Sequence, residues 1–233
     1  MDLKEIKQNI KKSWNWIWNS DSILSWIVAL ILIFIVVKFI FFPSLSLIFG
    51  TSLPLAGVES SSMDHRAIKY CTKYDSNLNC LAKSQDYEIC GIKFNKKTNL
   101  NSDEYWKTCG QWYEEKNISQ QQFSDFSMKN GFHKGDIIIV WGRFTPRIGD
   151  IIIFQPDSES SAPHPIIHRI VDIDNGIIQT KGDHNREQLA GNQFYNTDET
   201  NINESQIIGK AILKIPYLGW LKIWMIDLFK KIF

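Results

Sequence analysis

Residues 166–185 read IIHRIVDIDNGIIQTKGDHN, and this stretch decides the fold class. Its two halves, Ile166–Val171 and Gly176–Thr180, are dominated by isoleucine and other residues that favour strands. Between them, the Asp-Asn-Gly sequence at 174–176 has the composition of a tight turn. The pattern therefore predicts two adjacent strands joined by a short turn.

Chemistry-bearing residues lie in this predicted hairpin. His168 interrupts an apolar strand, where a buried imidazole is costly unless it has a polar partner. Asp183 follows the second strand, after Gly182 has allowed a tight turn. We expect the hairpin to bring His168 and Asp183 to neighbouring positions, as a base and the acid that orients it.

The surrounding sequence repeats the strand pattern. Short Ile- and Val-rich runs follow Gly, Pro or Asn, and the phrase GDIII occurs twice, which indicates two strands entered through similar turns. The fold class predicted is mainly β. The further strands expected are Asp136–Val140, Asp150–Phe154 and Gln206–Ile215.

The N-terminal part of the chain is typical of a membrane anchor. Residues 22–42 read SILSWIVALILIFIVVKFIFF with a single charge, Lys38, and a helix of about 20 residues spans the hydrocarbon layer. Pro43 is expected to end this helix, and residues 44–58 are expected to be extended. A cleaved signal peptide is the alternative, but the apolar run is too long and bulky residues follow it.

Charge asymmetry predicts the orientation of this anchor. Four lysines precede the span, whereas the 20 residues after Phe42 contain no Lys or Arg. The positive-inside rule then puts the N-terminus in the cytoplasm and everything after Pro43 on the extracytoplasmic side of the cell membrane, as a single-pass protein.

Val58–Met63, which reads VESSSM, offers candidate nucleophiles close to the anchor. A serine hydroxyl becomes reactive only where a base removes its proton and hydrogen-bond donors stabilise the oxyanion. Taken alone, three consecutive serines are more often a polar loop.

All four cysteines fall in a polar segment between the serines and the first long strand. An even number of cysteines outside the cytoplasm indicates disulfides, with three pairings open. Free thiols are the alternative where the exterior is not oxidising. A zinc site with four cysteine ligands is disfavoured because no two cysteines have the short spacing that such sites use. The cysteines are Cys71, Cys80, Cys90 and Cys109. In the same segment, Ser119–Phe126 has helix-like spacing behind a candidate N-cap, Ser119.

The C-terminal segment 216–233 is amphipathic. Its apolar residues share one helical face and its lysines another, which predicts a helix lying in the membrane interface. A second membrane pass and an ordinary core helix are the alternatives.

The motifs in their order resemble a known family. VESSSM, the two GDIII strands, HRIV and TKGDHN behind an apolar N-terminal segment are similar to the boxes of type I signal peptidases, in the archaeal and endoplasmic-reticulum branch. The resemblance implies a membrane-bound serine endopeptidase that removes signal peptides from exported preproteins, with a mostly β catalytic domain. It also allows association with the secretion machinery.

The resemblance assigns roles to individual residues. The nucleophile is the serine before Met63, namely Ser62, and the general base is His168, where the bacterial branch has lysine. Ser60 matches a position whose hydroxyl assists the Ser62 N–H in the oxyanion hole. Asp183 is the expected acid.

The sequence departs from the family pattern in three places. Leu189 occupies the position of a frequent second aspartate, so Glu187 is a weaker substitute for the acid. His65 stands where proline is common. Residues 64–133 form an insertion between the serine box and the next strand. The sequence assigns it no function, and a cap over the substrate groove and a partner surface are both compatible with it.

Two alternatives remain open. One is a Ser-Lys peptidase with Lys181 as its base, and the other is a non-enzymatic anchored β-domain whose cysteine-bearing segment binds a partner. The domain boundaries predicted are a cytoplasmic segment 1–21, an anchor 22–42, a peptidase domain 43–63 and 134–215, an inserted subdomain 64–133 and an interfacial helix 216–233.

Composition excludes other classes. The 233 residues contain 26 Lys and Arg against 25 Asp and Glu, for a net charge of +1, so no nucleic-acid partner is expected. The lipid bilayer and preproteins are the expected partners. No cofactor and no metal is expected, because His164 and His168 would lie far apart in a strand.

Overall fold

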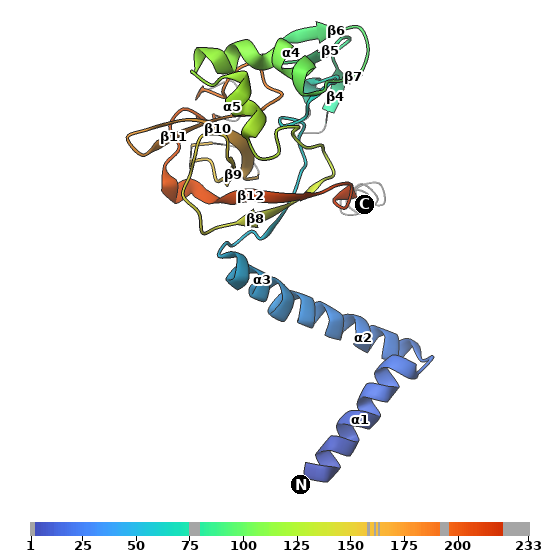
Figure 1. Cartoon of the computed structure of the whole chain (residues 1–233). Coiled ribbons are helices and arrows are strands. Elements are labelled where there is room, and N and C mark those ends of the chain that lie inside the picture. The colour runs from blue at the N-terminus through green and yellow to red at the C-terminus, as the bar shows by residue number, and fades with distance from the viewer. Residues whose placement is uncertain are drawn as a thin grey trace. The chain divides into compact units, whose positions relative to one another are not determined.

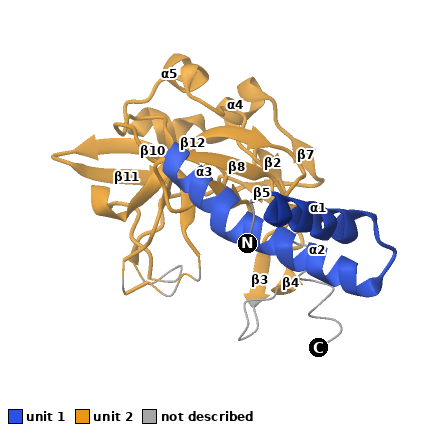
Figure 2. Cartoon of the chain, turned by 90° about the horizontal axis from the view of Figure 1, so that it is seen from below, with its two compact units in different colours: residues 1–49 blue, residues 50–233 orange. Residues whose placement is uncertain are grey.

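The computed structural model describes residues 3–74, 80–157, 159–160, 162, 164–191 and 196–220. The chain divides into two compact units, residues 1–49 and residues 50–233, which Figure 2 shows in different colours. The first unit is helical and the second contains the β-sheet.

The N-terminal unit contains a long apolar helix. Helix α1 (Leu3–Asn19) is followed by α2 (Ile23–Val36), by one π-helical turn, η1 (Val37–Phe41), and by α3 (Phe42–Phe49). The last three elements form a continuous helix of 27 residues, Ile23–Phe49, which is long and apolar enough to cross a membrane.

The predicted end of this helix at Pro43 is wrong. Pro43 lies in the first turn of α3, and the residues after it continue as helix to Phe49 instead of becoming extended. A proline inside a helix lacks an N–H and crowds the carbonyl four residues earlier. Here the wider π-turn directly precedes it, and the Phe42 N–H bonds to Val37 O, five residues back. The π-turn therefore accommodates the proline without ending the helix.

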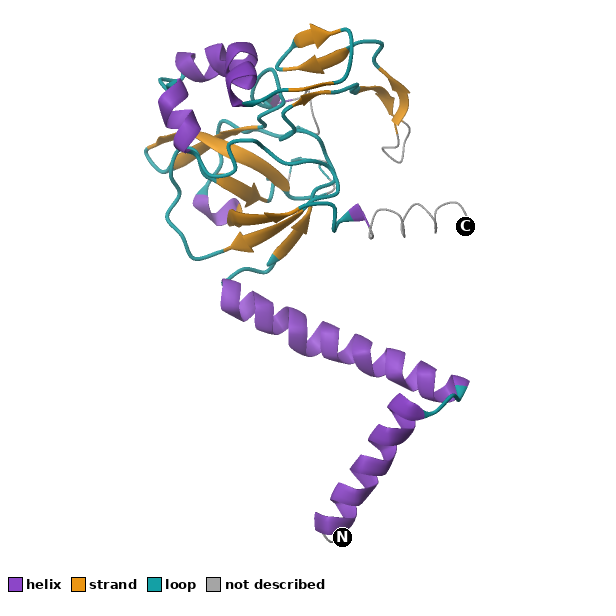
Figure 3. Ribbon diagram, turned by 45° about the vertical axis from the view of Figure 1, so that its right-hand side comes forward, coloured by secondary structure: helices purple, strands orange, loops and turns teal. Residues whose placement is uncertain are grey.

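The second unit is built on one six-stranded antiparallel sheet, visible as arrows in Figure 1 and in orange in Figure 3. This confirms the mainly β prediction and the position of every predicted strand. The spatial order is β1-β8-β12-β9-β10-β11. The strands are β1 (Leu55–Gly57), β8 (Ile137–Trp141), β9 (Ile151–Phe154), β10 (Ile166–Asp174), β11 (Ile177–Lys181) and β12 (Ile207–Ile215).

The core lies on both faces of the sheet. In β9, Ile151 and Ile153 pack into one apolar cluster, and Ile152 and Phe154 pack into another on the opposite face. Side chains alternate between the two faces of a strand, and both faces of β9 are covered by other parts of the protein. All four residues of β9 are therefore apolar.

The cysteine-bearing region, residues 64–133, adds small hairpins and two helices to the second unit. Its strands are β2 (Arg66–Ala67), β3 (Cys71–Tyr74), β4 (Cys80–Lys83), β5 (Tyr87–Ile89), β6 (Ile92–Phe94) and β7 (Thr98–Asn99), and its helices are α4 (Ser102–Glu115) and α5 (Gln120–Asp125). The predicted helix with Ser119 as its N-cap is confirmed by α5.

The expectation of disulfides is also confirmed. Cys71 pairs with Cys80 across the β3–β4 hairpin, and Cys90 pairs with Cys109 between the β5–β6 hairpin and α4. A third cluster of buried residues, including Tyr105, Tyr113 and Phe123, packs this region against Val171 of β10.

The described chain ends shortly after β12, which the short 3-10 helix η3 (Glu204–Gln206) precedes. Residues 221–233 lie outside the described residues, so the prediction of an amphipathic helix at 216–233 stays a prediction.

Candidate active site

The candidate nucleophile lies in the loop that leaves β1. Val58 fixes the start of this loop, because its N–H donates to Asp136 O at 2.9 Å and its carbonyl accepts from the Gly135 N–H at 2.9 Å. Ser62 is half-buried, and its Oγ lies 3.1 Å from Ser60 Oγ. The loop therefore holds the two hydroxyls side by side at the edge of the sheet.

His168 reaches this loop from β10. It pairs with Ile152 of β9 and is only 2% exposed. A Cβ atom on Gly182 would lie 2.8 Å from His168 Nε2 and 2.7 Å from Ser62 O. The Ser62 carbonyl and the His168 ring are therefore neighbours, and a side chain at residue 182 would clash with both.

The Ser62 hydroxyl is bonded to Ser60 and not to His168. The hydrogen-bond partner of Ser62 Oγ is Ser60 Oγ, whereas His168 uses its Nδ1 atom for a different bond. Catalytic hydrogen bonds are often loose before substrate binds, and rotation of one serine side chain changes the partner of its hydroxyl. The arrangement places Ser62, through its backbone carbonyl, next to the His168 ring, with its hydroxyl bonded to Ser60.

Glu199 is the carboxylate partner of His168, and the sequence did not predict it. Its Oε1 atom is bonded to His168 Nδ1, and both side chains are buried. The Thr180 hydroxyl donates to the same oxygen at 2.8 Å, and the Leu189 N–H donates to Oε2 at 2.7 Å. A carboxylate held in this way orients the ring and fixes a proton on Nδ1, which leaves Nε2 free to accept one.

The structure does not bring Asp183 to His168, which corrects the expected pairing. Arg169 of β10 pairs with Lys181 of β11, so His168, one residue earlier, faces the side of the sheet to which Gly182 points. The Asp183 carboxylate lies with Arg169 instead, accepting from its Nε at 2.9 Å and its Nη2 at 2.7 Å. Because side chains alternate between the two faces of a strand, Asp183 lies on the face of Arg169 and not on the face of its neighbour His168.

Asp183 has a different set of partners. Besides Arg169, its carboxylate is bonded to His65 Nε2 at 3.0 Å and to the Tyr113 hydroxyl at 3.1 Å. Burial alone would raise the pKa of Asp183, but the charge of Arg169 and the hydrogen bonds from His65 and Arg169 hold it well below its ordinary value. Asp183 is thus a buried, ionised carboxylate at the centre of a network.

The substitute acid also lies elsewhere. Glu187 forms an ion pair with Arg186 at 3.4 Å, and both side chains are about three-quarters exposed, at 71% and 77%. In the described part of the chain, no hydrogen bond or ion pair joins Glu187 to His168. The signal that could have found Glu199 was weak, because it lies 31 residues after His168 in a polar segment without a motif.

Lys181 faces away from the candidate base. It shares the Arg169 side of the sheet, its Nζ donates to Gly182 O at 3.1 Å, and it lies 5.0 Å from the centre of the Trp112 ring. Burial lowers the pKa of Lys181 to about 8, although Asp183 and Glu199 oppose this shift. Among the described residues, no hydrogen bond joins Lys181 to Ser62.

Metal ligands do not gather near these residues. Within the part of the chain that the structure describes, no group of three His, Cys, Asp or Glu side chains is arranged to hold an ion. His164 lies at the surface, 3.5 Å from Glu59.

A half-buried serine beside a buried imidazole that is hydrogen-bonded to a carboxylate is the arrangement of a serine hydrolase. No family model matches the chain. The chain is similar to the signal peptidase complex catalytic subunit SEC11 of Saccharomyces cerevisiae strains YJM789 and RM11-1a, each 32% identical over 108 residues. The match covers 42% of this chain and 60% of the yeast protein, so less than two thirds of the relative is spanned. The similarity confirms the resemblance to signal peptidases of the endoplasmic-reticulum type.

Proposed function

We propose that this chain is a membrane-bound serine endopeptidase that cleaves signal peptides from exported preproteins. The observation that carries the proposal is the meeting of Ser62 and His168 at Gly182, from segments over a hundred residues apart in sequence. The similarity to a signal peptidase catalytic subunit supports the substrate class.

The chemistry is acyl transfer. His168 Nε2 accepts the proton of Ser62 Oγ as this oxygen attacks the carbonyl carbon of the scissile peptide bond. The Ser60 hydroxyl and the Ser62 N–H stabilise the negative oxygen of the tetrahedral intermediate. The imidazolium then gives its proton to the leaving amine, and water, activated by the same imidazole, hydrolyses the acyl-enzyme.

Glu199 is the acidic member of this proposed set in place of Asp183. Its bond to His168 Nδ1 keeps the ring in the tautomer that a base requires, and its charge offsets the imidazolium that forms during the reaction. The two hydrogen bonds from Thr180 and Leu189 hold the carboxylate in place.

The proposed location follows from the N-terminal unit. The apolar helix Ile23–Phe49 anchors the chain, with the lysines of α1 on the cytoplasmic side and the β-domain outside. Two disulfides in the β-domain support a compartment that allows their formation. The relative's name, a subunit of a complex, supports association with other secretion proteins.

A preprotein cleavage assay on the full chain in detergent tests the proposal. Ser62→Ala and His168→Ala should each reduce cleavage to background, because each removes a group that forms or breaks a bond. Ser61→Ala is the matched control, since Ser61 bonds through its backbone carbonyl, which accepts from the Asp64 N–H at 3.0 Å. If the wild-type chain is folded and cleaves nothing, the non-enzymatic β-domain becomes the better interpretation.

A further inference from the structure

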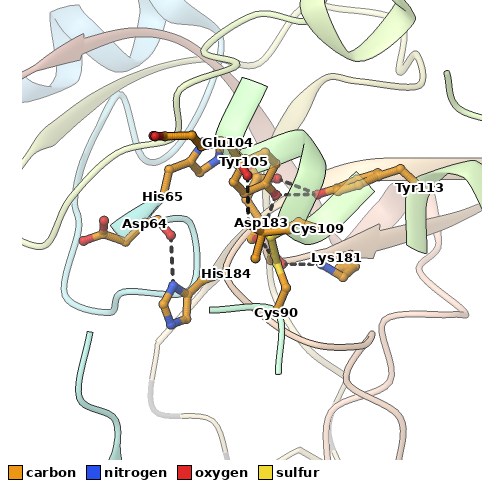
Figure 4. Close-up of a disulfide and its surroundings, with 12 residues drawn as sticks. Asp64, His65, Cys90, Glu104, Tyr105, Cys109, Tyr113, Lys181, Asp183 and His184 are labelled. Carbon is orange, nitrogen blue, oxygen red and sulfur yellow. Dashed lines mark hydrogen bonds and ion pairs between the residues drawn. A yellow bond between two sulfur atoms is a disulfide. The ribbon is translucent and has the colours of Figure 1, made fainter. Parts of the chain in front are cut away.

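The cysteine-bearing region contacts Asp183 and His184 of the turn at residues 182–184 (Figure 4). The Tyr105 hydroxyl of α4 donates to Asp183 O at 2.7 Å. The Cys90 N–H, at the tip of the β5–β6 hairpin, donates to His184 O at 2.9 Å. Two backbone carbonyls of the turn are therefore bonded to a region that the sequence places outside the peptidase motifs.

A second tyrosine of α4 strengthens this contact. The Tyr113 hydroxyl donates to Asp183 Oδ1 at 3.1 Å and lies 3.2 Å from the Tyr105 hydroxyl. Both tyrosines are fully buried, and the Tyr105 ring stacks on His65 with 3.7 Å between ring centres. Buried hydroxyls with such partners hold a fixed geometry, because breaking either bond leaves a polar group unsatisfied.

The Cys90–Cys109 disulfide joins the two sources of these contacts. Cys109 lies in α4 between the tyrosines and is 3% exposed. Cys90 and Gly91 form a two-residue hairpin loop with φ angles of 51° and 79°, a geometry that favours glycine and asparagine. The disulfide ties this hairpin tip to the helix, and Cys90 Sγ lies 3.4 Å from Asp183 O.

The other side of the turn holds the nucleophile loop. The His184 N–H donates to Ser62 O at 2.8 Å, and His184 Nδ1 is bonded to Asp64 O at 2.9 Å. The turn is thus bonded to the disulfide region on one side and to the Ser62 backbone on the other. A displacement of the turn would displace Ser62 relative to His168.

We infer that Tyr105, Tyr113 and the Cys90–Cys109 disulfide form a clamp that positions Ser62 through the 182–184 turn. The inference rests on the proposed function, and it assigns the cysteine-bearing region a part in building the active site. We assign these residues a positioning role, because their bonds reach Ser62 through the turn. Their effect on the rate arises from alignment, because a displacement of about 1 Å can cost up to about 10²-fold in rate.

The chain contains a matched control for this clamp. Cys71 and Cys80 form the second disulfide, between β3 and the exposed strand β4. In the described part of this hairpin, no hydrogen bond reaches the 182–184 turn. Removing either disulfide takes one cross-link from the unfolded chain. Only removal of Cys90–Cys109 also loosens the contact with the 182–184 turn. Comparison of Cys90→Ser/Cys109→Ser with Cys71→Ser/Cys80→Ser therefore separates positioning from a general loss of stability.

The experiment measures kcat and KM for preprotein cleavage, and amide hydrogen exchange at residues 182–185, in the folded full chain. Cys90→Ser/Cys109→Ser should lower kcat by about tenfold to 10²-fold with little change in KM, and should speed exchange in the turn. Cys71→Ser/Cys80→Ser should leave both readouts near wild type. Tyr105→Phe/Tyr113→Phe, which removes only two hydroxyls, gives the same test if the first variant does not fold.

Equal kcat values and equal exchange in the two folded disulfide variants would overturn the clamp. A wild-type chain that cleaves no preprotein would overturn the proposed function instead. In that case hydrogen exchange, which needs no activity, still decides whether the clamp holds the turn.

Discussion

At the residue scale, the two buried carboxylates Glu199 and Asp183 have separable roles. Glu199→Gln keeps the shape of the side chain but removes the charge beside the imidazole. We expect kcat to fall by about 10⁴-fold, as on loss of the acid in a serine triad. Asp183→Asn should act mainly on stability, because it weakens the ion pair with buried Arg169.

Preprotein cleavage and urea unfolding of the same variants measure these two effects. Glu187→Gln is the control, since the Glu187 side chain is 71% exposed and pairs with Arg186 at the surface. It should change neither the rate nor the free energy of unfolding. A larger loss of kcat in Asp183→Asn than in Glu199→Gln, at equal stability, would return the acidic role to Asp183.

Lys181 gives a second prediction at the residue scale. A lysine base works in its neutral form, and the pKa of Lys181 is about 8, so a Lys181 enzyme would gain activity as pH rises through 8. With His168 as base, the cleavage rate should not follow the titration of Lys181. Lys181→Met should keep most of this activity. A profile that keeps rising through pH 8 and disappears in Lys181→Met would support the Ser-Lys alternative.

At the scale of elements, the sequence predicted strands well and their side-chain partners poorly. The hairpin of β10 and β11 was evident from its Ile-rich runs and its Asp-Asn-Gly turn. Its register was not evident, and a shift of one residue moves a side chain to the other face of the sheet. The sequence could therefore predict that the backbones of His168 and Asp183 lie close together. It could not predict that the Asp183 side chain would bind Arg169.

The long-range contacts explain the remaining differences. Glu199 reaches His168 because its own backbone pairs with Leu189, where its N–H donates to the Leu189 carbonyl at 2.8 Å. No local pattern encodes such a contact between two loops. Proline likewise ends most helices. At Pro43 the helix continues because a π-turn, which is a rare structure, directly precedes it.

At the scale of the whole molecule, the proposed function requires the β-domain to lie outside the cytoplasm. The chain carries its own reporters of location, because Asn117 in NIS and Asn203 in NES are glycosylation sequons. Both asparagines lie at the surface of the second unit. Their modification requires the lumenal side of the endoplasmic reticulum, so it reports the orientation that the lysines of α1 predict.

Translation of the full chain with microsomes tests this orientation. We expect two glycans, seen as a stepwise mass increase that enzymatic deglycosylation removes, and none in Asn117→Gln/Asn203→Gln. Replacing Lys4, Lys7, Lys11 and Lys12 with glutamate removes the positive charge before the helix, and should lower the glycosylated fraction, because lysine and arginine retain a flank in the cytoplasm. A membrane-inserted wild-type chain without glycans, whose second unit is digested by protease added outside the vesicles, would reverse the proposed orientation. The β-domain would then face the cytoplasm, away from the compartment in which signal peptides are removed.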